Sequence, residues 1–228
     1  MATHHLLVIA FRKDNMRKIG LLIYVIFGFC YIANAQSDQF KKVDHPVELI
    51  DLLQQKTSGV NSIESSFTQH KHLSFLEDDV VSKGKFVFKK PNKVKWEYLT
   101  PASYRIICNN EQMVIDDGVK KQIFYEKDNQ WFSYMNKMMS GFMTGKVFDM
   151  DDAFDSQYFR HDNLVKVELL PKNPLVKEYL KSVWVFFDLN KDFVTVLQLN
   201  EIGQDYTKII FEGQVYNQKV DEKSFMDQ

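Results

Sequence analysis

The sequence predicts a mainly β protein of the α+β class, built on one antiparallel sheet with a few short helices. Three observations predict it. Apolar and polar residues alternate in many short stretches, as in strands with one buried and one solvated face. Turn-forming pairs such as Asn109-Asn110, Asp117-Gly118 and Asn190-Lys191 separate these stretches. Few helical segments lie between them, so neighbouring strands are expected to pair antiparallel.

The N-terminus is predicted to be a removable secretory signal, residues 1–35, with an upstream extension before Met16. Arg17 and Lys18 supply a positive start, Ile19–Phe29 is almost wholly apolar, and Ala33-Asn34-Ala35 is a small-x-small cleavage site. The apolar run is shorter than the roughly 18 residues that a membrane-spanning helix needs. We expect residues 36–228 to form a single domain, because no Pro- or Gly-rich linker divides them.

A short helix is predicted to open this domain. Asp44 and Pro46 are typical of a helix start, and Val47, Ile50 and Leu53 follow at helical spacing. Gly59 is placed to end the segment.

Strands are predicted over most of the remaining chain. The alternation places them near Ile63–Phe75, Val81–Lys89, Lys93–Leu99, Tyr104–Cys108, Gln112–Ile115, Lys120–Tyr125, Gln157–Arg160, Val165–Leu170, Ser182–Asp188, Phe193–Asn200 and Thr207–Glu212.

One segment departs from the strand pattern. Gln130–Thr144 is rich in methionine, has apolar residues at helical spacing, and is followed by Gly145 as a terminator. A helix packed on the sheet explains this pattern. Methionine side chains are also flexible and soft, so the same helix suits a lid over an apolar ligand. The predicted lid residues are Phe132, Met135, Met139 and Phe142.

The charge balance argues against nucleic acid as a partner. The chain has a net charge of −1, and the predicted signal removes more basic than acidic residues. Cys108 is the single cysteine beyond the signal, so the domain is expected to fold without an internal disulfide. We interpret Cys108 as a small core residue, because no basic neighbour is evident to activate its thiol.

Catalytic and metal-binding motifs were sought, and their patterns are incomplete. His70 and His72 share one face of a strand, but a metal site needs a third and a fourth ligand. The acidic run Asp149–Asp155 has Phe154 and Arg160 where a calcium loop has glycine and glutamate. Ser140 lies in no G-x-S-x-G elbow. We therefore expect no enzyme, no metal and no cofactor.

Gly84–Pro101, GKFVFKKPNKVKWEYLTP, favours a binding function. It reads as two strands with aromatic residues on one face and Lys90 at the end of the row. An apolar concave face with one cation at its rim suits a ligand that is apolar with a polar end. The same aromatic residues are equally consistent with the core of a sandwich. The predicted cavity residues are Phe67, Phe86, Phe88, Val94, Trp96, Tyr98 and Met113.

Several motifs in order give a family resemblance. Ser66-Phe67-Thr68-Gln69 precedes the G-x-F-x-F-K-K-P stretch at Gly84–Pro91, and Trp96-Glu97-Tyr98 follows. Gly203–Ile209, GQDYTKI, then precedes a strand near the C-terminus. This ordered set, over roughly Val47 to Phe225, resembles the periplasmic outer-membrane lipoprotein carrier family, LolA-type.

The resemblance implies a fold and a function. The fold is an open, strongly curved antiparallel half-barrel with short helices covering its concave face. Acyl chains of a lipoprotein are held between sheet and lid, taken from an inner-membrane ABC release complex and passed to an outer-membrane acceptor. Family members carry arginine where this chain has Lys90, which becomes the candidate lid latch, and often an aromatic residue where it has Val94. The implied location is the periplasm of a Gram-negative-type bacterium, and we expect a monomer.

Two other binding functions fit the same sequence. A carrier of another envelope lipid or glycolipid would show the same apolar face, and so would a lipid-sensing regulatory domain. The residues alone leave these alternatives open.

Overall fold

The computed structural model describes residues 40–109, 112–125, 127, 138–145, 152–191 and 194–226. All of them belong to one compact unit, Phe40–Gln228. The predicted signal peptide lies outside the described residues.

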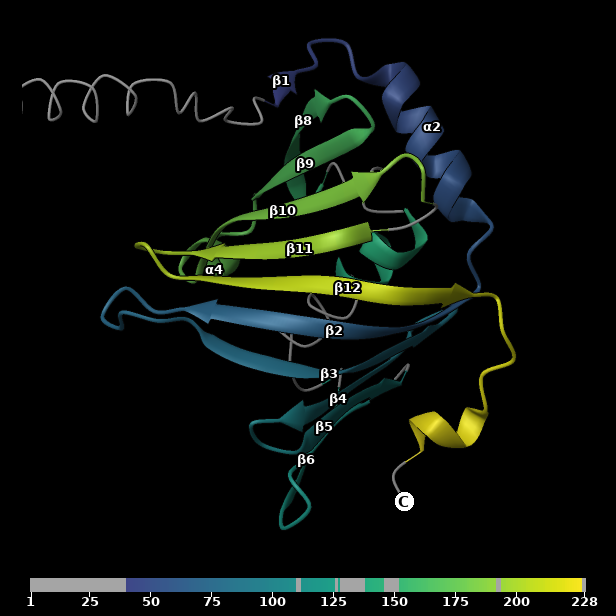
Figure 1. Cartoon of the computed structure of the whole chain (residues 1–228), viewed down its shortest axis with the longest axis vertical. Coiled ribbons are helices and arrows are strands. Elements are labelled where there is room, and N and C mark those ends of the chain that lie inside the picture. Colours follow the sequence, from purple (N-terminus) through teal and green to yellow (C-terminus); the bar gives the residue numbers. More distant parts are fainter. Residues whose placement is uncertain are drawn as a thin grey trace, which may run out of the picture. The chain divides into compact units, whose positions relative to one another are not determined.

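The unit is built on one open antiparallel sheet of 12 strands, which confirms the predicted fold class (Figure 1). The spatial order is β1-β8-β9-β10-β11-β12-β2-β3-β4-β5-β6-β7, so the late strand β12 pairs with the early strand β2 in mid-sheet. The strands are β1 (Lys41–Lys42), β2 (Ser62–His72), β3 (Val80–Lys89), β4 (Lys93–Thr100), β5 (Tyr104–Asn109), β6 (Gln112–Asp116), β7 (Lys121–Tyr125), β8 (Phe154–His161), β9 (Leu164–Pro171), β10 (Leu180–Asp188), β11 (Val194–Glu201) and β12 (Tyr206–Tyr216).

The observed strand ends differ from the predicted ones where turns and bulges intervene. β2 stops at His72 because the chain turns there, with the amide of Leu76 donating to the carbonyl of Leu73 (2.8 Å). β12 continues past the predicted end at Glu212, because Gly213, at φ +62°, sits in a bulge that lets pairing resume at Val215. The two-residue strand β1 is too short to give an alternating pattern, and the sequence did not predict it.

The helix α2 (Val47–Ser58) exists as predicted, and of the three residues predicted at helical spacing Leu53 is buried and Ile50 packs against the core. Leu49, Leu53 and Thr57 form its buried stripe at a spacing of four residues. Val47 is 66% exposed because it lies in the first turn, so its predicted place on the buried face is wrong. Pro46 occupies the N-cap position without a side-chain cap, so the predicted capping role of Asp44 is also wrong.

Two further helical turns carry their own capping residues, and a third helical segment lies within the predicted helix Gln130–Thr144. Asn173 caps α4 (Pro174–Lys177) and Asp221 caps the 3-10 helix η4 (Glu222–Phe225), each by accepting a backbone N–H bond. Residues 138–144 are helical. No helix in the described ranges is long and apolar enough to cross a bilayer.

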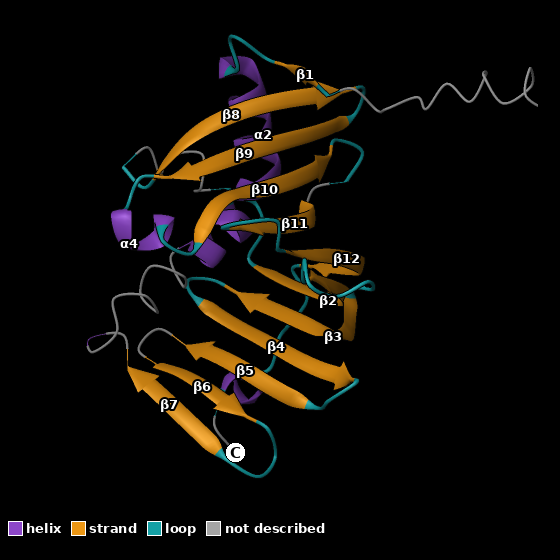
Figure 2. Cartoon of the chain, turned by 90° about the vertical axis from the view of Figure 1, so that its left-hand side faces the viewer, coloured by secondary structure: helices purple, strands orange, loops and turns teal. Residues whose placement is uncertain are grey.

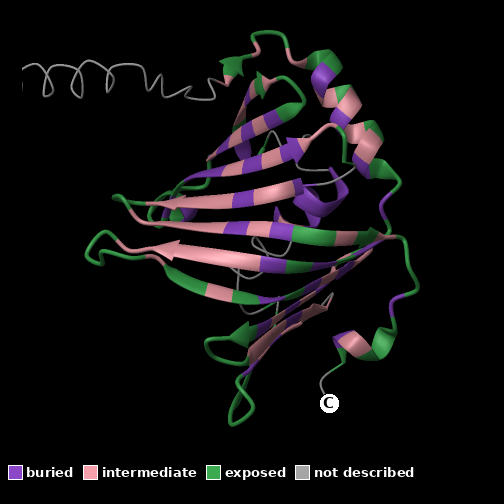
Figure 3. Cartoon of the chain, in the orientation of Figure 1, coloured by how far each residue is buried: buried purple, intermediate pink, exposed green. Residues whose placement is uncertain are grey.

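The core lies on one face of the sheet, which we call the inner face. Buried and more exposed residues alternate along the strands in Figure 3, and the buried set forms one cluster with Leu49 and Leu53 of α2. Residues of segment 138–144 join the same cluster, so helices cover the inner face as predicted. Figure 2 shows that the strands form one continuous, twisted sheet, in the spatial order from β8 through β12 and β2 to β7.

The C-terminal segment packs on the opposite, outer face. Val220 and Phe225 form a second buried cluster with Ile107 and Val114, and Val87 packs against it. The carboxylate of Glu222 pairs with both Lys89 and Lys93. These ion pairs hold the pKa of Glu222 down at about 2, with the hydrogen bond from Lys89 as the largest cause.

Candidate functional site

The centre of the inner face is an aromatic wall, which we define as Phe67, Phe86, Trp96, Tyr98 and Phe211. Their rings pack edge-to-face or tilted, with centroid separations from 4.5 Å for Phe86–Trp96 to 5.9 Å for Trp96–Phe211. Strand pairing brings them together, since Phe211 faces Phe67 and Phe86 faces Trp96. All five are buried. The predicted cavity residues Phe88 and Val94 lie on the same face, at 0% and 2% exposure.

Gly84 makes room for this wall. It pairs with Phe67 on one side and Tyr98 on the other, and the ring of Phe67 lies over its backbone. A Cβ atom at Gly84 would lie 2.7 Å from two ring carbons of Phe67, and closer still to the carbonyl oxygen of Glu97. The backbone angle at Gly84 is one that other residues adopt. The glycine is required instead by the close approach of the Glu97 carbonyl and the Phe67 ring.

One end of the wall is polar. The hydroxyl of Tyr98 donates to Oε1 of Gln69 (2.8 Å), and its ring stacks on Tyr104 at 4.2 Å. Burial raises the pKa of Tyr98 well above its ordinary value, so the phenol stays protonated. Beyond Gln69 on the same face of β2, Lys71 pairs with Glu201, whose carboxylate also accepts from the hydroxyl of Thr207. Sequence reasoning missed this ion pair.

An open strip of half-buried apolar side chains continues the inner face beyond the wall. Register places Ile106 opposite Ile115, Cys108 opposite Met113, and Met113 opposite Phe124, so these five residues of β5, β6 and β7 share one face. All five are half-buried, and they define the open strip. Met113 is one of the predicted cavity residues, whereas Ile106, Ile115 and Phe124 were not predicted. The alternation of apolar residues along β5 and β6 could have indicated Ile106 and Ile115.

Cys108 belongs to the open strip and packs against the core. Removal from water raises the pKa of its thiol to about 12. At neutral pH the thiol is therefore protonated and a poor nucleophile. This agrees with the interpretation of Cys108 as a small apolar side chain.

Segment 138–144 contributes to the covered side of the inner face. Met138, Phe142 and Met143 are fully buried in the core cluster, and Met139 packs against it. Ser140 donates a hydrogen bond of 2.9 Å to the carbonyl of Pro91, in the turn between β3 and β4. The predicted lid residues Phe132 and Met135 lie outside the described residues.

Lys90, the candidate latch, lies in the same turn. Its ammonium donates to the carbonyl of Ser58 at the C-terminal end of α2 (2.9 Å), and its backbone amide donates to the carbonyl of Asn61 (2.8 Å). A cation at a helix C-terminus is favourable because free carbonyls gather there. The turn therefore contacts both α2 and segment 138–144.

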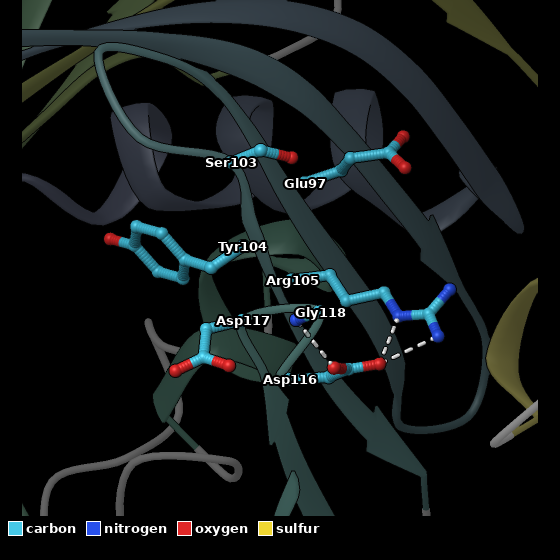
Figure 4. A pocket seen from close by; sticks show the side chains of 7 residues that line it. All are labelled: Glu97, Ser103, Tyr104, Arg105, Asp116, Asp117 and Gly118. Atoms are coloured by element: carbon cyan, nitrogen blue, oxygen red, sulfur yellow. Dashed lines mark hydrogen bonds and ion pairs between the residues drawn. The ribbon is translucent and has the colours of Figure 1, made fainter. Parts of the chain in front are cut away.

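A polar pocket of about 240 Å³ is lined by residues of β4, β5 and β6 and of the adjoining turns (Figure 4). One lining residue, Tyr104, stacks on Tyr98 of the aromatic wall. Arg105 donates from Nε and Nη2 to one oxygen of Asp116 at 3.0 and 2.7 Å, and the amide of Gly118 donates to the other oxygen at 2.8 Å. The bond from Gly118, followed by those from Arg105, lowers the pKa of Asp116. Arg105 and Asp116 form an ion pair within the pocket, and Asp117 accepts backbone hydrogen bonds from Val119 and Lys120. These contacts hold the ends of the hairpin together.

His70 and His72, which were predicted to share a face of one strand, both lie near the carboxylate of Asp79. Nδ1 of His72 lies 2.9 Å from Asp79 and Nδ1 of His70 lies 3.8 Å from it, while His72 stacks on Tyr206. In the part of the chain that the structure describes, no group of three or more His, Cys, Asp or Glu side chains is arranged to hold a metal ion. Asp149 and Asp151 of the acidic run lie outside the described residues.

An open antiparallel sheet with an apolar inner face and helices packed over it is the half-barrel architecture that the sequence predicted. Comparison with known families then gives a more specific assignment. The family described as "Outer membrane lipoprotein carrier protein LolA" matches residues 58–227, and the chain belongs to this family of lipid carriers.

Individual relatives are distant. The chain is 24% identical to an outer-membrane lipoprotein carrier protein of Francisella philomiragia, with 92% of each chain covered. It is 25% identical to a protein of the same name from Francisella tularensis, covering 89% of this chain and 98% of the relative.

Among solved structures, a LolA superfamily protein from Nitrosomonas europaea matches with a TM-score of 0.44 at 7% identity, over 81% of this chain and 99% of that one. A chain of the Pseudomonas aeruginosa MucA/MucB complex matches with a TM-score of 0.45 at 10% identity, over 79% of this chain and 60% of that one.

Proposed function

We propose that this protein is a periplasmic lipid-binding chaperone that carries outer-membrane lipoproteins by holding their acyl chains against its inner face. The observation that carries the proposal is the continuity of the aromatic wall with the half-buried open strip on a single face of the sheet. Family membership and the names of the Francisella relatives support the choice of lipoprotein as cargo. Binding requires no catalytic residue and no cofactor.

The affinity of such a site comes from apolar contact. Each CH₂ group moved from water to the inner face contributes about 0.8 kcal/mol, so part of one acyl chain already binds strongly. Release therefore needs loss of enclosure. The helices that contact the β3–β4 turn through Lys90 and Pro91 are the elements whose movement would expose the ligand.

The partners follow from this role. An inner-membrane ABC release complex would load the carrier, and an outer-membrane acceptor with a more apolar site would unload it. The predicted signal at residues 1–35 supports delivery to the periplasm. Lys90 would act as a latch by holding α2 to the β3–β4 turn.

Binding can be tested with substitutions on two neighbouring strands. Phe88→Glu places a charge at a fully buried inner-face position of β3, and Trp96→Glu does so on β4. Both variants should lose binding of a fluorescent fatty-acid probe. Val81→Glu is the matched control, because Val81 lies on β3 but is 42% exposed. Circular dichroism must show that each variant remains folded; unchanged binding in a folded Phe88→Glu variant contradicts the proposal.

The cargo can be identified in the cell. Native mass spectrometry of protein purified from the envelope should show bound acylated species. Depletion of the protein followed by membrane fractionation should leave lipoproteins in the inner membrane. Accumulation of a glycolipid or another lipid instead would redirect the function to that molecule.

A further inference from the structure

Ser65 carries a buried hydroxyl that has no hydrogen-bond partner. Among the described side chains it is the single buried nitrogen- or oxygen-bearing group in this state. The residue is 7% exposed. Leaving a buried hydroxyl unpaired costs free energy, so nearly all such groups in native proteins are bonded. An exception on the inner face calls for a physical explanation.

The surroundings of Ser65 are apolar and belong to the candidate site. Ser65 alternates with Ile63 and Phe67 along β2, which places all three on the inner face, and it pairs with Phe86 of β3. A buried water needs two to four polar partners, and these flanking side chains offer none. The Ser65 hydroxyl therefore lies beside Phe67 and Phe86 of the aromatic wall, and none of the three flanking side chains can accept a hydrogen bond from it.

The neighbouring strand is irregular at the same level. The register of β12 against β2 shifts between Glu212 and Val215, which face Ser66 and Glu64 on either side of Ser65. Gly213 in this bulge has φ +62°. Bulges interrupt pairing and often lie beside functional sites. The irregular backbone and the unpaired hydroxyl thus meet at one point of the inner face.

We propose that the Ser65 hydroxyl donates a hydrogen bond to an ester or amide carbonyl of the bound lipid, at the point where an acyl chain joins the lipoprotein N-terminus. This inference rests on the function proposed above. A carbonyl oxygen is the polar atom that every acyl chain carries, and it accepts but cannot donate. The bond forms when a ligand replaces the side chains that cover Ser65. Serine thereby fixes how deep the chains enter, while the apolar wall supplies most of the affinity.

The test uses two synthetic lipopeptides that differ only in carbonyl groups. One has two ester-linked palmitoyl chains on a glyceryl-cysteine peptide, and the other has ether-linked hexadecyl chains. The purified, delipidated protein should bind the ester probe more tightly by about two- to twelvefold, the range expected for one net hydrogen bond. Ser65→Ala should abolish this preference and leave the ether probe unaffected.

Two controls separate a ligand contact from a structural role. Ser66→Ala changes the adjacent, exposed serine on the outer face and should keep the ester preference. The thermal midpoint of ligand-free Ser65→Ala should equal or exceed that of the unmodified protein, because the substitution removes an unpaired polar group.

The possible outcomes distinguish failure of the Ser65 hydrogen bond from failure of the proposed carrier function. Equal weakening of both probes by Ser65→Ala, or weakening of neither, overturns the hydrogen bond while the carrier function stands. Failure of the unmodified protein to bind either probe overturns both. Diacyl and dialkyl phosphatidylcholines with the same chains form a second arm. A Ser65-dependent preference seen in that arm alone overturns the assignment to lipoprotein acyl groups.

Discussion

Replacing Gly84 by alanine should destabilise the protein strongly, because the site has no space for a methyl group. The new Cβ would lie 2.7 Å from the ring of Phe67 and closer to the carbonyl of Glu97, which belongs to the β4 backbone. The ring can rotate away, but the paired strand cannot move without loss of ladder hydrogen bonds. Overpacking of this kind costs about 1–3 kcal/mol, and the backbone contact places Gly84→Ala near the upper limit.

The expected loss can be measured by thermal unfolding. For a protein of this size, 1 kcal/mol corresponds to roughly 2–4 °C, so a loss of about 3 kcal/mol lowers the midpoint by roughly 6–12 °C. Gly59→Ala is the matched control. A Cβ at Gly59 meets nothing within 4 Å, and φ there is −74°, so that change should be neutral or slightly stabilising.

Two results would refute this reasoning. One is an unchanged midpoint in Gly84→Ala, which would mean that the sheet absorbs a methyl group at no cost. The other is full restoration of stability by adding Phe67→Leu. The smaller side chain removes the contact with the ring but leaves the one with Glu97, so only partial recovery is expected.

Three further predictions address single groups. The first concerns Cys108, in protein that begins at Gln36. Its thiol should react with a thiol reagent at pH 8 on the order of a thousandfold more slowly in the folded protein than in the unfolded chain, because burial raises its pKa to about 12. Comparable rates in the two states would contradict this burial. Asp116→Asn should reduce the loss of stability in acid, because folding lowers the pKa of Asp116. The ionised carboxylate therefore stabilises the folded protein above the ordinary pKa of 3.8, and this stabilisation disappears as the pH falls through the lower pKa of the folded state. Parallel stability–pH curves for the two proteins would argue against it. Lys90→Met should release a bound fatty-acid probe about two- to tenfold faster, while Lys90→Arg, which keeps a donor for Ser58, should stay near the unmodified rate; identical rates for both variants would exclude the latch.

The strands could be predicted because alternation records which face of each strand is buried. Phe86, Phe88, Trp96 and Tyr98 show this directly, because their spacing alone predicts that they share one face, and all four are buried in the core. The helix α2 shows the limit. Its apolar residues include Val47 in the first turn, and the sequence does not reveal that the helix turns this residue to solvent.

Features that depend on distant pairing could not be predicted. Lys71 on β2 and Glu201 on β11 are separated by 130 positions. They come together because β12 pairs with β2 on one side and with β11 on the other. The unpaired state of Ser65 is invisible in the sequence for the same reason. A serine between Ile63 and Phe67 fits the strand pattern, and whether an acceptor lies nearby depends on the neighbouring strands.

The pairing of β12 with β2 also constrains how the chain can fold. β2–β7 and β8–β11 are each connected in sequence order and can pair as successive hairpins. They are joined through β12, which is synthesised after every other strand of this sheet. Until Tyr206–Tyr216 is in place, β2 and β11 each present an unpaired edge, and such edges invite pairing with other chains. The incomplete protein is therefore at its most aggregation-prone before Tyr206–Tyr216 pairs with both edges, when a chaperone that shields unpaired strands would help it most.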